Sequence, residues 1–142
     1  MNALDTNIIA YLLSNDDRKI GISQRLLSEG VVISVQVLNE LTNVARRKAK
    51  LDWQEVARLV EGVKSLCTVT PLTLRIHDEG RRLAERYRLS TCDALICAAA
   101  LDFGAKRLYS DDMQHGLLLD DALRIINPYL PSNRSLSAHD SD

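Results

Sequence analysis

Apolar and polar segments along the chain predict strands that alternate with helices. A short apolar run reaches Asp5, and an amphipathic segment begins at Ile8, which is the pattern of a strand, a turn and a helix. The β-branched run at residues 31–35 is typical of a second strand. From Val37 the apolar positions repeat with the period of a helix. This order predicts βαβ units, a mostly parallel sheet and right-handed crossovers.

One helical segment is apolar on all sides. Between Asp93 and Asp102 no residue is more polar than Cys97, and Gly104 then ends the helix. A helix without a polar face has to be buried, so we expect this one at the centre of the molecule. The other expected elements are a connection at residues 14–19, helices over residues 22–27, 53–66 and 74–87, and strands over residues 68–71, 107–110 and 123–126.

Length and composition indicate one globular α/β domain. The chain has 142 residues, of which 46% are hydrophobic and 26% are charged, enough for a single core and too little for two. We expect this domain to cover residues 1–130. Residues 131–142 contain few apolar side chains and are predicted to form a flexible tail.

Charge and cysteine content exclude several classes of protein. The formal net charge of −1 gives no support for binding nucleic acid or a membrane through bulk electrostatics. Three cysteines without a CxxC pair argue against a disulfide framework or a zinc knuckle. The longest apolar run, residues 94–101, is too short to span a bilayer. We therefore expect a soluble protein of the cytoplasm with no membrane association.

Acidic residues stand at or beside the boundaries of four expected elements. Asp5 ends the first strand, Asp93 opens the apolar helix, and Asp111 and Asp112 follow the fourth strand. Glu40 borders the apolar face of the helix that begins after the second strand. Open parallel sheets bind their ligands at the carboxyl ends of the strands, so the positions of these acids favour a common site.

Each acid also has a structural explanation. Asp5 and Asp93 could cap helices, the adjacent aspartates after the fourth strand could form a turn, and Glu40 could pair with Arg47. Several carboxylates at one edge of a sheet, however, repel one another unless a cation neutralises them. Hard oxygen ligands suit Mg²⁺ or Mn²⁺. The chemistry that needs these parts is metal-dependent hydrolysis of a phosphodiester.

Four motifs surround these acids: LDTNI at Asp5, VLNELTNVARR around Glu40, LSTCDALICAAAL around Asp93 and LYSDDMQHG around Asp112. Together they resemble the PIN-domain ribonucleases, specifically the VapC-type toxins of bacterial toxin–antitoxin pairs, over residues 1–129. The resemblance implies a three-layer α/β/α sandwich with a mostly parallel central sheet. It also implies a Mg²⁺-dependent endoribonuclease.

The resemblance assigns roles to individual residues. Asp5, Glu40, Asp93 and Asp112 match the acidic quartet of the family. It implies that Asp5 and Asp93 bind the metal directly, and that Asp112 and Glu40 hold metal-bound water or a second ion. One of these two also orients the attacking water or accepts its proton. The adjacent Asp111 leaves the fourth acid open between two residues, although the spacing from the preceding serine favours Asp112.

The resemblance also implies partners. VapC-type toxins form homodimers and are held inactive by a small cognate VapB-like antitoxin, and their substrate would be a structured RNA such as tRNA or ribosomal RNA. Two groups of basic residues could contact RNA phosphates, and the first is favoured because it follows Glu40 on the same helix. The groups are Arg46, Arg47, Lys48 and Lys50, and Arg75, Arg82 and Arg86.

Three other functions remain open from the residues alone. A catalytically silent PIN-like module would bind RNA or a protein without cleaving, but the complete quartet argues against it. Enzymes that phosphorylate an aspartate need an acidic pair at the first strand and a supporting lysine, and neither is evident here. A nuclease of the same architecture that acts on DNA would use the same metal chemistry.

Overall fold

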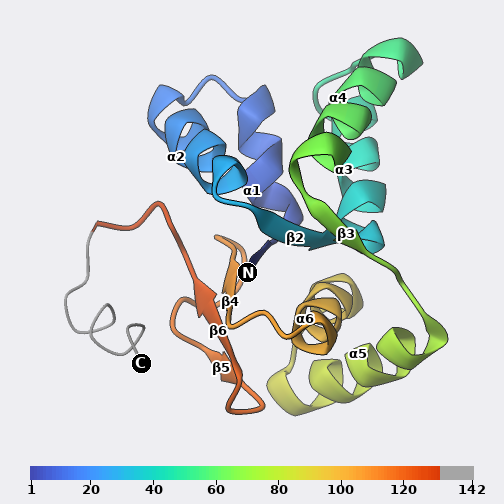
Figure 1. Cartoon of the computed structure of the whole chain (residues 1–142), viewed down its shortest axis with the longest axis vertical. Helices are drawn as coiled ribbons and strands as arrows, with labels where there is room; N and C mark the ends of the chain where they lie inside the picture. Colours follow the sequence, from blue (N-terminus) through green and yellow to red (C-terminus); the bar gives the residue numbers. More distant parts are fainter. Residues whose placement is uncertain (132–142) are drawn as a thin grey trace.

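A six-stranded sheet forms the centre of the computed structural model, which describes residues 1–131 (Figure 1). The strand order is β3-β2-β1-β4-β6-β5, and every neighbouring pair is parallel except β5 and β6. The mostly parallel sheet expected from the sequence is therefore confirmed. The strands are β1 (Asn2–Leu4), β2 (Val31–Ser34), β3 (Thr68–Thr70), β4 (Arg107–Tyr109), β5 (Leu118–Leu119) and β6 (Leu123–Ile126).

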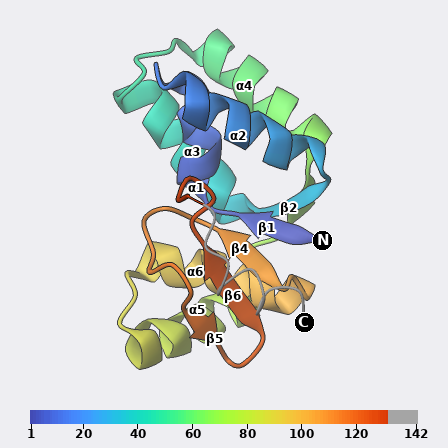
Figure 2. The ribbon, with the colours of Figure 1, turned by 90° about the vertical axis from the view of Figure 1, so that its left-hand side faces the viewer.

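Helices cover both faces of this sheet. Helices α5 and α6 lie together on one side, and α1 and α2 lie on the other (Figures 1 and 2), with α6 in contact with β2 and β6 and α2 in contact with β2. This is the α/β/α order that was expected. The helices are α1 (Thr6–Ala10), the 3₁₀ turn η1 (Tyr11–Leu13), α2 (Asp17–Ser28), α3 (Val35–Arg47), α4 (Trp53–Leu66), α5 (Leu74–Tyr87) and α6 (Thr91–Phe103).

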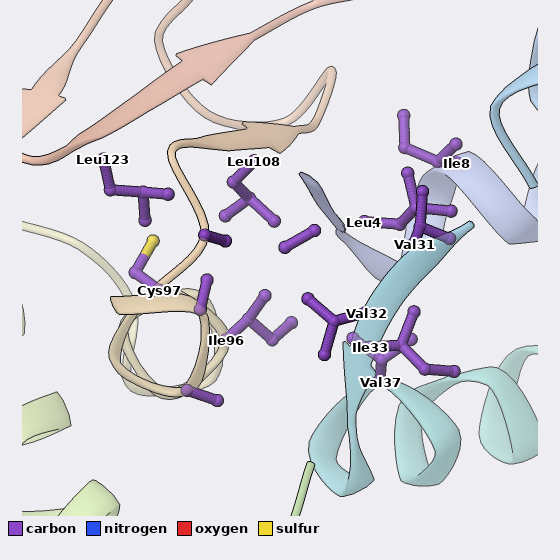
Figure 3. Close-up of a cluster of buried hydrophobic side chains, with 14 of the residues drawn as sticks. Leu4, Ile8, Val31, Val32, Ile33, Val37, Ile96, Cys97, Leu108 and Leu123 are labelled. Carbon is purple, nitrogen blue, oxygen red and sulfur yellow. The ribbon is translucent and has the colours of Figure 1, made fainter. Parts of the chain in front are cut away.

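Strand β2 joins the two layers of the core. Its four residues are all buried, as expected for a strand inside a parallel sheet. Successive side chains alternate between the faces. Val31 points toward Leu4 and Ile8, and Val32 points toward Ile96 on α6 (Figure 3). The β-branched run in the sequence therefore supplies apolar side chains to both sides of the sheet.

Helix α6 is the buried helix that its composition predicts. Most of its side chains from Ala94 to Ala100 are buried. Helix α6 also packs closely against α5, because a Cβ added at Gly80 of α5 would lie 2.8 Å from Cδ2 of Leu95. A larger residue at this position would therefore force the Leu95 side chain to move. Burying α6 in this way fixes the position of Asp93 in its first turn.

Three local predictions differ from the structure. The polar run at residues 14–19 is not all connection, because Asp16 caps α2 by accepting a hydrogen bond from the Lys19 amide at 3.1 Å, and the helix then extends from Asp17 to Ser28. The first helix begins at Thr6 rather than at Ile8. The sequence pattern also missed β5, whose two residues are too few to show an alternation.

The described residues bear on two further expectations. No helix among residues 1–131 is long and apolar enough to cross a membrane. The flexible tail expected at residues 131–142 lies outside the described residues from residue 132 onward, so it stays a prediction.

Candidate active site

The topology brings the acids of the sequence to one edge of the sheet. Strands β1 and β4 are parallel neighbours, so the residues that follow them, Asp5 and the turn with Asp112, lie at the same edge. The amide of Asp5 donates to the carbonyl of Tyr109 at 2.9 Å, which joins the two strand ends. The negative charges of Asp93 and Asp112 act on the Asp5 carboxyl, and that of Asp112 acts on the Asp93 carboxyl, so the three acids lie near one another.

Asp5 is the most deeply buried of these acids, with 2% of its surface exposed. Both carboxylate oxygens accept hydrogen bonds at 2.7 Å: Oδ1 accepts from the Thr6 amide, and Oδ2 accepts from the Ser110 hydroxyl. The first bond makes Asp5 the N-cap of α1. The capping role considered for Asp5 is therefore correct. The capping hydrogen bond also holds the Asp5 carboxylate in the cluster.

Burial disfavours the charged form of Asp5. It raises the pKa of the Asp5 carboxyl to about 7, against the opposing effect of the two hydrogen bonds, and the negative charges of Asp93 and Asp112 raise it further. The pKa of the Asp93 carboxyl is raised by burial and then by the charge of Asp112. The cluster therefore has an excess of negative charge that a cation would relieve.

Ser110 connects Asp5 to the turn that carries Asp112. Its hydroxyl donates to Asp5 and accepts from the amides of Asp112 at 3.2 Å and Met113 at 3.3 Å. This uses the one donor and both acceptor positions of a serine hydroxyl. Ser110 is fully buried, whereas Asp112 is exposed. The backbone amide of Asp112 is thus held by Ser110, whereas its side chain is exposed to solvent.

The neighbouring Asp111 is held by a different set of contacts. The Tyr11 hydroxyl donates a short hydrogen bond to Asp111, and the Lys19 ammonium donates to that hydroxyl at 3.1 Å. Asp111 raises the pKa of Tyr11, but it does not perturb Asp5 or Asp93 as Asp112 does. The sequence left the fourth acid of the quartet open between Asp111 and Asp112. In the structure, Asp112 is the one that interacts with Asp5 and Asp93.

Glu40 joins the site through Thr6. Its Oε1 accepts from the Thr6 hydroxyl at 3.1 Å, and its Oε2 accepts from the Gln36 side chain at 2.9 Å. Since the Thr6 amide also binds Asp5, one residue orients both acids. In the described part of the chain, Glu40 is paired with these two groups rather than with Arg47, which the sequence offered as its partner.

Asp93 is positioned by the start of α6. The Ser90 hydroxyl caps this helix by accepting from the Asp93 amide at 3.1 Å. An acid in the first turn is also favoured by the helix dipole. The cap of this helix is therefore Ser90, and Asp93 takes part through its amide. Together, capping and the burial of α6 bring Asp93, which is half-buried, to the edge of the sheet beside Asp5 and Asp112.

A groove of about 450 Å³ adjoins the acids and runs between α1 with η1 and α3. We call it the α1–α3 groove. Glu40, Asp111 and Asp112 belong to its lining, and so does Lys48 at the end of α3. The side chain of Asn7 also belongs to the lining, and both its amide atoms are buried without a hydrogen-bond partner among the described residues. The remaining lining residues are Thr6, Ala10, Tyr11, Leu13, Ser14, Val44 and Ala49.

The donor set suits a hard cation. No group of three or more His, Cys, Asp or Glu side chains within residues 1–131 is arranged so that it could itself enclose a metal ion. Mg²⁺, however, is commonly bound by one or two carboxylates and keeps several water ligands. Asp5 and Asp93 offer carboxylate oxygens of that kind, and the pKa of both is raised, by burial first and then by the negative charge of neighbouring acids.

The structure separates the two groups of basic residues. Arg46 stacks over the Trp53 ring at 4.5 Å and donates to the Leu51 carbonyl at 2.9 Å, whereas Lys48 faces the groove. The second group is engaged on its own surface: Arg75 pairs with Asp102, Arg82 with Glu79 and Asp120, and Arg86 lies over Tyr87. These contacts give the second group a structural role on its own surface.

Comparison with known families decides the classification. The model of the PIN domain family matches residues 3–117. The chain belongs to the PIN domain family. This confirms the family that the sequence motifs around Asp5, Glu40, Asp93 and Asp112 resemble. No curated protein sequence matches this PIN domain at a significant level.

Solved structures support the same fold. A toxin–antitoxin complex from Klebsiella pneumoniae matches with a TM-score of 0.69 at 19% identity, covering 91% of this chain and 98% of the other. FitAcB from Neisseria gonorrhoeae matches with a TM-score of 0.64 at 20% identity, covering 91% and 99%. VapC20 from Mycobacterium tuberculosis, titled a sarcin–ricin loop cleaving toxin, matches with a TM-score of 0.61 at 19% identity, covering 78% and 88%.

Several residues of the site in this PIN domain were missed by sequence reasoning. Thr6, Asn7, Tyr11 and Lys19 have no charge pattern or spacing that marks them as part of a site. Thr6 contacts Glu40 and Tyr11 contacts Asp111, both of which are distant in the sequence, and Lys19 joins the site through Tyr11. The one available signal was the position of Thr6 and Asn7 directly after Asp5, at the start of a helix.

Proposed function

We propose that this PIN domain is a Mg²⁺-dependent endoribonuclease and the toxin of a toxin–antitoxin pair, with Mn²⁺ as an alternative ion. The observation that carries the proposal is the cluster of Asp5, Asp93 and Asp112. Three elements supply these acids beside an open groove, where burial raises the pKa of Asp5 and Asp93 and the negative charge of Asp112 raises both further. A stable fold has no need to gather repelling carboxylates at one edge, so a cation-dependent activity explains them best.

The acids would divide the work between them. Asp5 and Asp93 would hold the metal ion, and Asp112 would serve as a further ligand or hold a metal-bound water. Such an ion, when bound, lowers the pKa of water and stabilises the charge that develops on phosphoryl oxygens. Ser110 keeps the Asp5 carboxylate in a single orientation through its 2.7 Å hydrogen bond.

A carboxylate would accept the proton of the attacking water. Asp112 suits this role because it is exposed, whereas both oxygens of Glu40 already accept hydrogen bonds from Thr6 and Gln36. Glu40 would then orient the water and maintain the position of Thr6. Attack on phosphorus breaks the P–O3′ bond and leaves a 5′-phosphate on the released strand.

The proposed substrate is a structured RNA, such as tRNA or ribosomal RNA. One structural neighbour is named a sarcin–ricin loop cleaving toxin, and another is a toxin–antitoxin complex. We accordingly propose a VapB-like antitoxin as partner, a homodimer as the assembly and the cytoplasm as the location. A cationic side chain of the antitoxin would be attracted to the uncompensated carboxylates.

Cleavage of total bacterial RNA tests the proposal. Purified protein is incubated with Mg²⁺ or with EDTA, and the new RNA ends are sequenced. We expect discrete cuts that disappear with EDTA and fall by at least about 100-fold in Asp93→Asn. The matched control is Asp102→Asn, which removes an acid from the far end of the same helix and should cut like the wild type. An equal pattern in wild type and Asp93→Asn would contradict the proposal and favour a silent binding module.

A further inference from the structure

The turn that follows β4 carries Asp112 and is anchored by side chains on two sides. On the inner side, the buried Ser110 hydroxyl accepts hydrogen bonds from the amides of Asp112 and Met113. On the outer side, the Asp111 carboxylate accepts a short hydrogen bond from the Tyr11 hydroxyl. Residues 111–114 belong to no helix or strand. The position of this turn therefore depends on such side-chain contacts.

Lys19 fixes the direction of the hydrogen bond between Tyr11 and Asp111. Its ammonium group donates to the Tyr11 hydroxyl at 3.1 Å, and an ammonium group cannot accept. The hydroxyl oxygen therefore accepts from Lys19, and its own proton is donated to Asp111. A hydrogen bond to an ionised carboxylate is roughly twice as strong as one between neutral groups. Tyr11 thus holds Asp111 by the stronger kind of bond.

The Tyr11 ring is itself held by elements that are distant in the sequence. Its centroid lies 4.9 Å from that of Tyr129 in an edge-to-face contact, and the Lys19 ammonium lies 4.5 Å from the Tyr11 centroid. Tyr129 is buried, and its hydroxyl shares a 2.8 Å hydrogen bond with Ser23 of α2. Arg18 of the same helix donates to the Tyr129 carbonyl at 2.6 Å. The Tyr11 hydroxyl therefore has a fixed place from which it can hold the turn.

We propose that Tyr11 is a positioning residue of the active site, which holds the turn after β4 through Asp111 and thereby sets the place of the Asp112 carboxylate. The inference rests on the proposed nuclease function and adds to it a residue that acts through Asp112 rather than on the phosphate. The backbone transmits the effect, because a shift of Asp111 moves its neighbour with it. Removal of groups that orient a metal-binding residue commonly costs about 10- to 100-fold in metal affinity or activity.

Tyr11→Phe tests this role, because it removes the hydroxyl and keeps the ring. The rate of cleavage is followed on total bacterial RNA at saturating Mg²⁺ with protein in excess, and Mg²⁺ affinity is measured separately by calorimetry. We expect the rate and the Mg²⁺ affinity each to fall by about 10-fold or more. The matched control is Tyr87→Phe, since the Tyr87 hydroxyl also donates to an aspartate, Asp120, but at the turn between β5 and β6. This control should behave like the wild type.

Two changes at Asp111 separate the hydrogen bond from the charge. Asp111→Asn keeps an oxygen that can accept from Tyr11 and should retain the wild-type rate, whereas Asp111→Ala should lose as much as Tyr11→Phe. The double variant Tyr11→Phe/Asp111→Ala should be no slower than either single variant, because both changes remove the same bond. Equal losses of rate in Asp111→Asn and Asp111→Ala would assign the effect to the charge of Asp111 and overturn the inference.

Thermal unfolding separates positioning from a purely structural role. If Tyr11 only stabilised the fold, Tyr11→Phe would lower the thermal midpoint, while the cleavage rate and Mg²⁺ affinity of the folded protein stayed at their wild-type values. That result would overturn the inference.

The outcomes also distinguish this inference from the proposed function. If the wild type and Tyr11→Phe cut RNA at the same rate, the positioning role is wrong and the nuclease stands. If the wild type does not cut RNA, the nuclease proposal fails and Mg²⁺ affinity decides the role of Tyr11. Equal affinity in the wild type and Tyr11→Phe, or no Mg²⁺ binding by either, would then overturn that role as well.

Discussion

At the scale of single residues, capping and the proposed chemistry use the same side chains. Asp5 caps α1, and its carboxylate is also the buried centre of the acidic cluster. The sequence identified Asp5 and Asp93 because both stand at element boundaries. It could not identify Thr6 as the link to Glu40, because that hydrogen bond joins residues 34 positions apart. Local patterns predict caps, whereas side-chain contacts between distant elements need the folded chain.

Ser110 provides a test at this scale. Ser110→Ala removes the donor to Asp5 and the acceptor of two backbone amides in a fully buried site. We expect the free energy of unfolding to fall by about 1–3 kcal/mol, measured by urea denaturation. Ser28→Ala is the control, since Ser28 is exposed and donates only to the Arg25 carbonyl. Equal losses in the two variants would show that the Ser110 network adds nothing.

At the scale of elements, the pattern of apolar residues predicted which segment is buried in the core. The all-apolar segment became the buried α6, whereas the turn between β5 and β6 gave no recognisable signal. That turn places Asp120 and Asp121 at positive φ values of 50° and 53°, a conformation for which Asn–Gly or Asp–Gly would have been the usual signal. Asp120 in this turn contacts Arg82 and Tyr87 of α5, and no local sequence pattern reveals these contacts.

The contact between this turn and α5 predicts a pH dependence. The Arg82 guanidinium is the main cause that lowers the pKa of the Asp120 carboxyl in the folded protein. The pair therefore contributes stability above the unfolded pKa of about 3.9, and this contribution is lost as the pH falls through the lower folded value. Asp120→Asn should destabilise the protein by at most about 1 kcal/mol at pH 7. Denaturant titrations should show a smaller difference in stability between wild type and Asp120→Asn at pH 3 than at pH 7. An equal difference at both pH values would show that the Arg82–Asp120 pair does not stabilise the protein.

The end of α5 offers a second test at this scale. Arg88 follows the helix with φ 57° and ψ 45°, a left-handed conformation that favours glycine. Arg88→Gly should raise the free energy of unfolding by about 0.5–1 kcal/mol, because relief of the strain exceeds the entropy cost of glycine. Arg86→Gly, inside the last turn, should lower it by about 1 kcal/mol. Thermal unfolding of both variants measures the direction of each change in stability. A change in the same direction for both variants would contradict the left-handed conformation of Arg88.

At the scale of the whole molecule, strand order produces the site. The order β3-β2-β1-β4-β6-β5 places β1 beside β4, so the acids that follow these strands meet at one edge. The sequence predicted parallel strands and the identity of the acids, but not the order of strands. It also gave no indication of the α1–α3 groove, because a groove depends on the relative placement of two helices. The strand pattern alone did not determine that the acids meet. That expectation came from the resemblance to PIN-domain sequences.

The central proposal is that Asp5 and Asp93, with Asp112 beside them, hold the divalent cation of a nuclease, and Mg²⁺ binding measured by calorimetry tests it most directly. We predict that wild type binds Mg²⁺, that Asp5→Asn and Asp93→Asn lose at least about tenfold in affinity, and that Asp111→Asn keeps wild-type affinity. Asp111 is the matched control because Tyr11 holds it outside the acidic cluster. Equal Mg²⁺ affinity in wild type and Asp5→Asn would contradict the account.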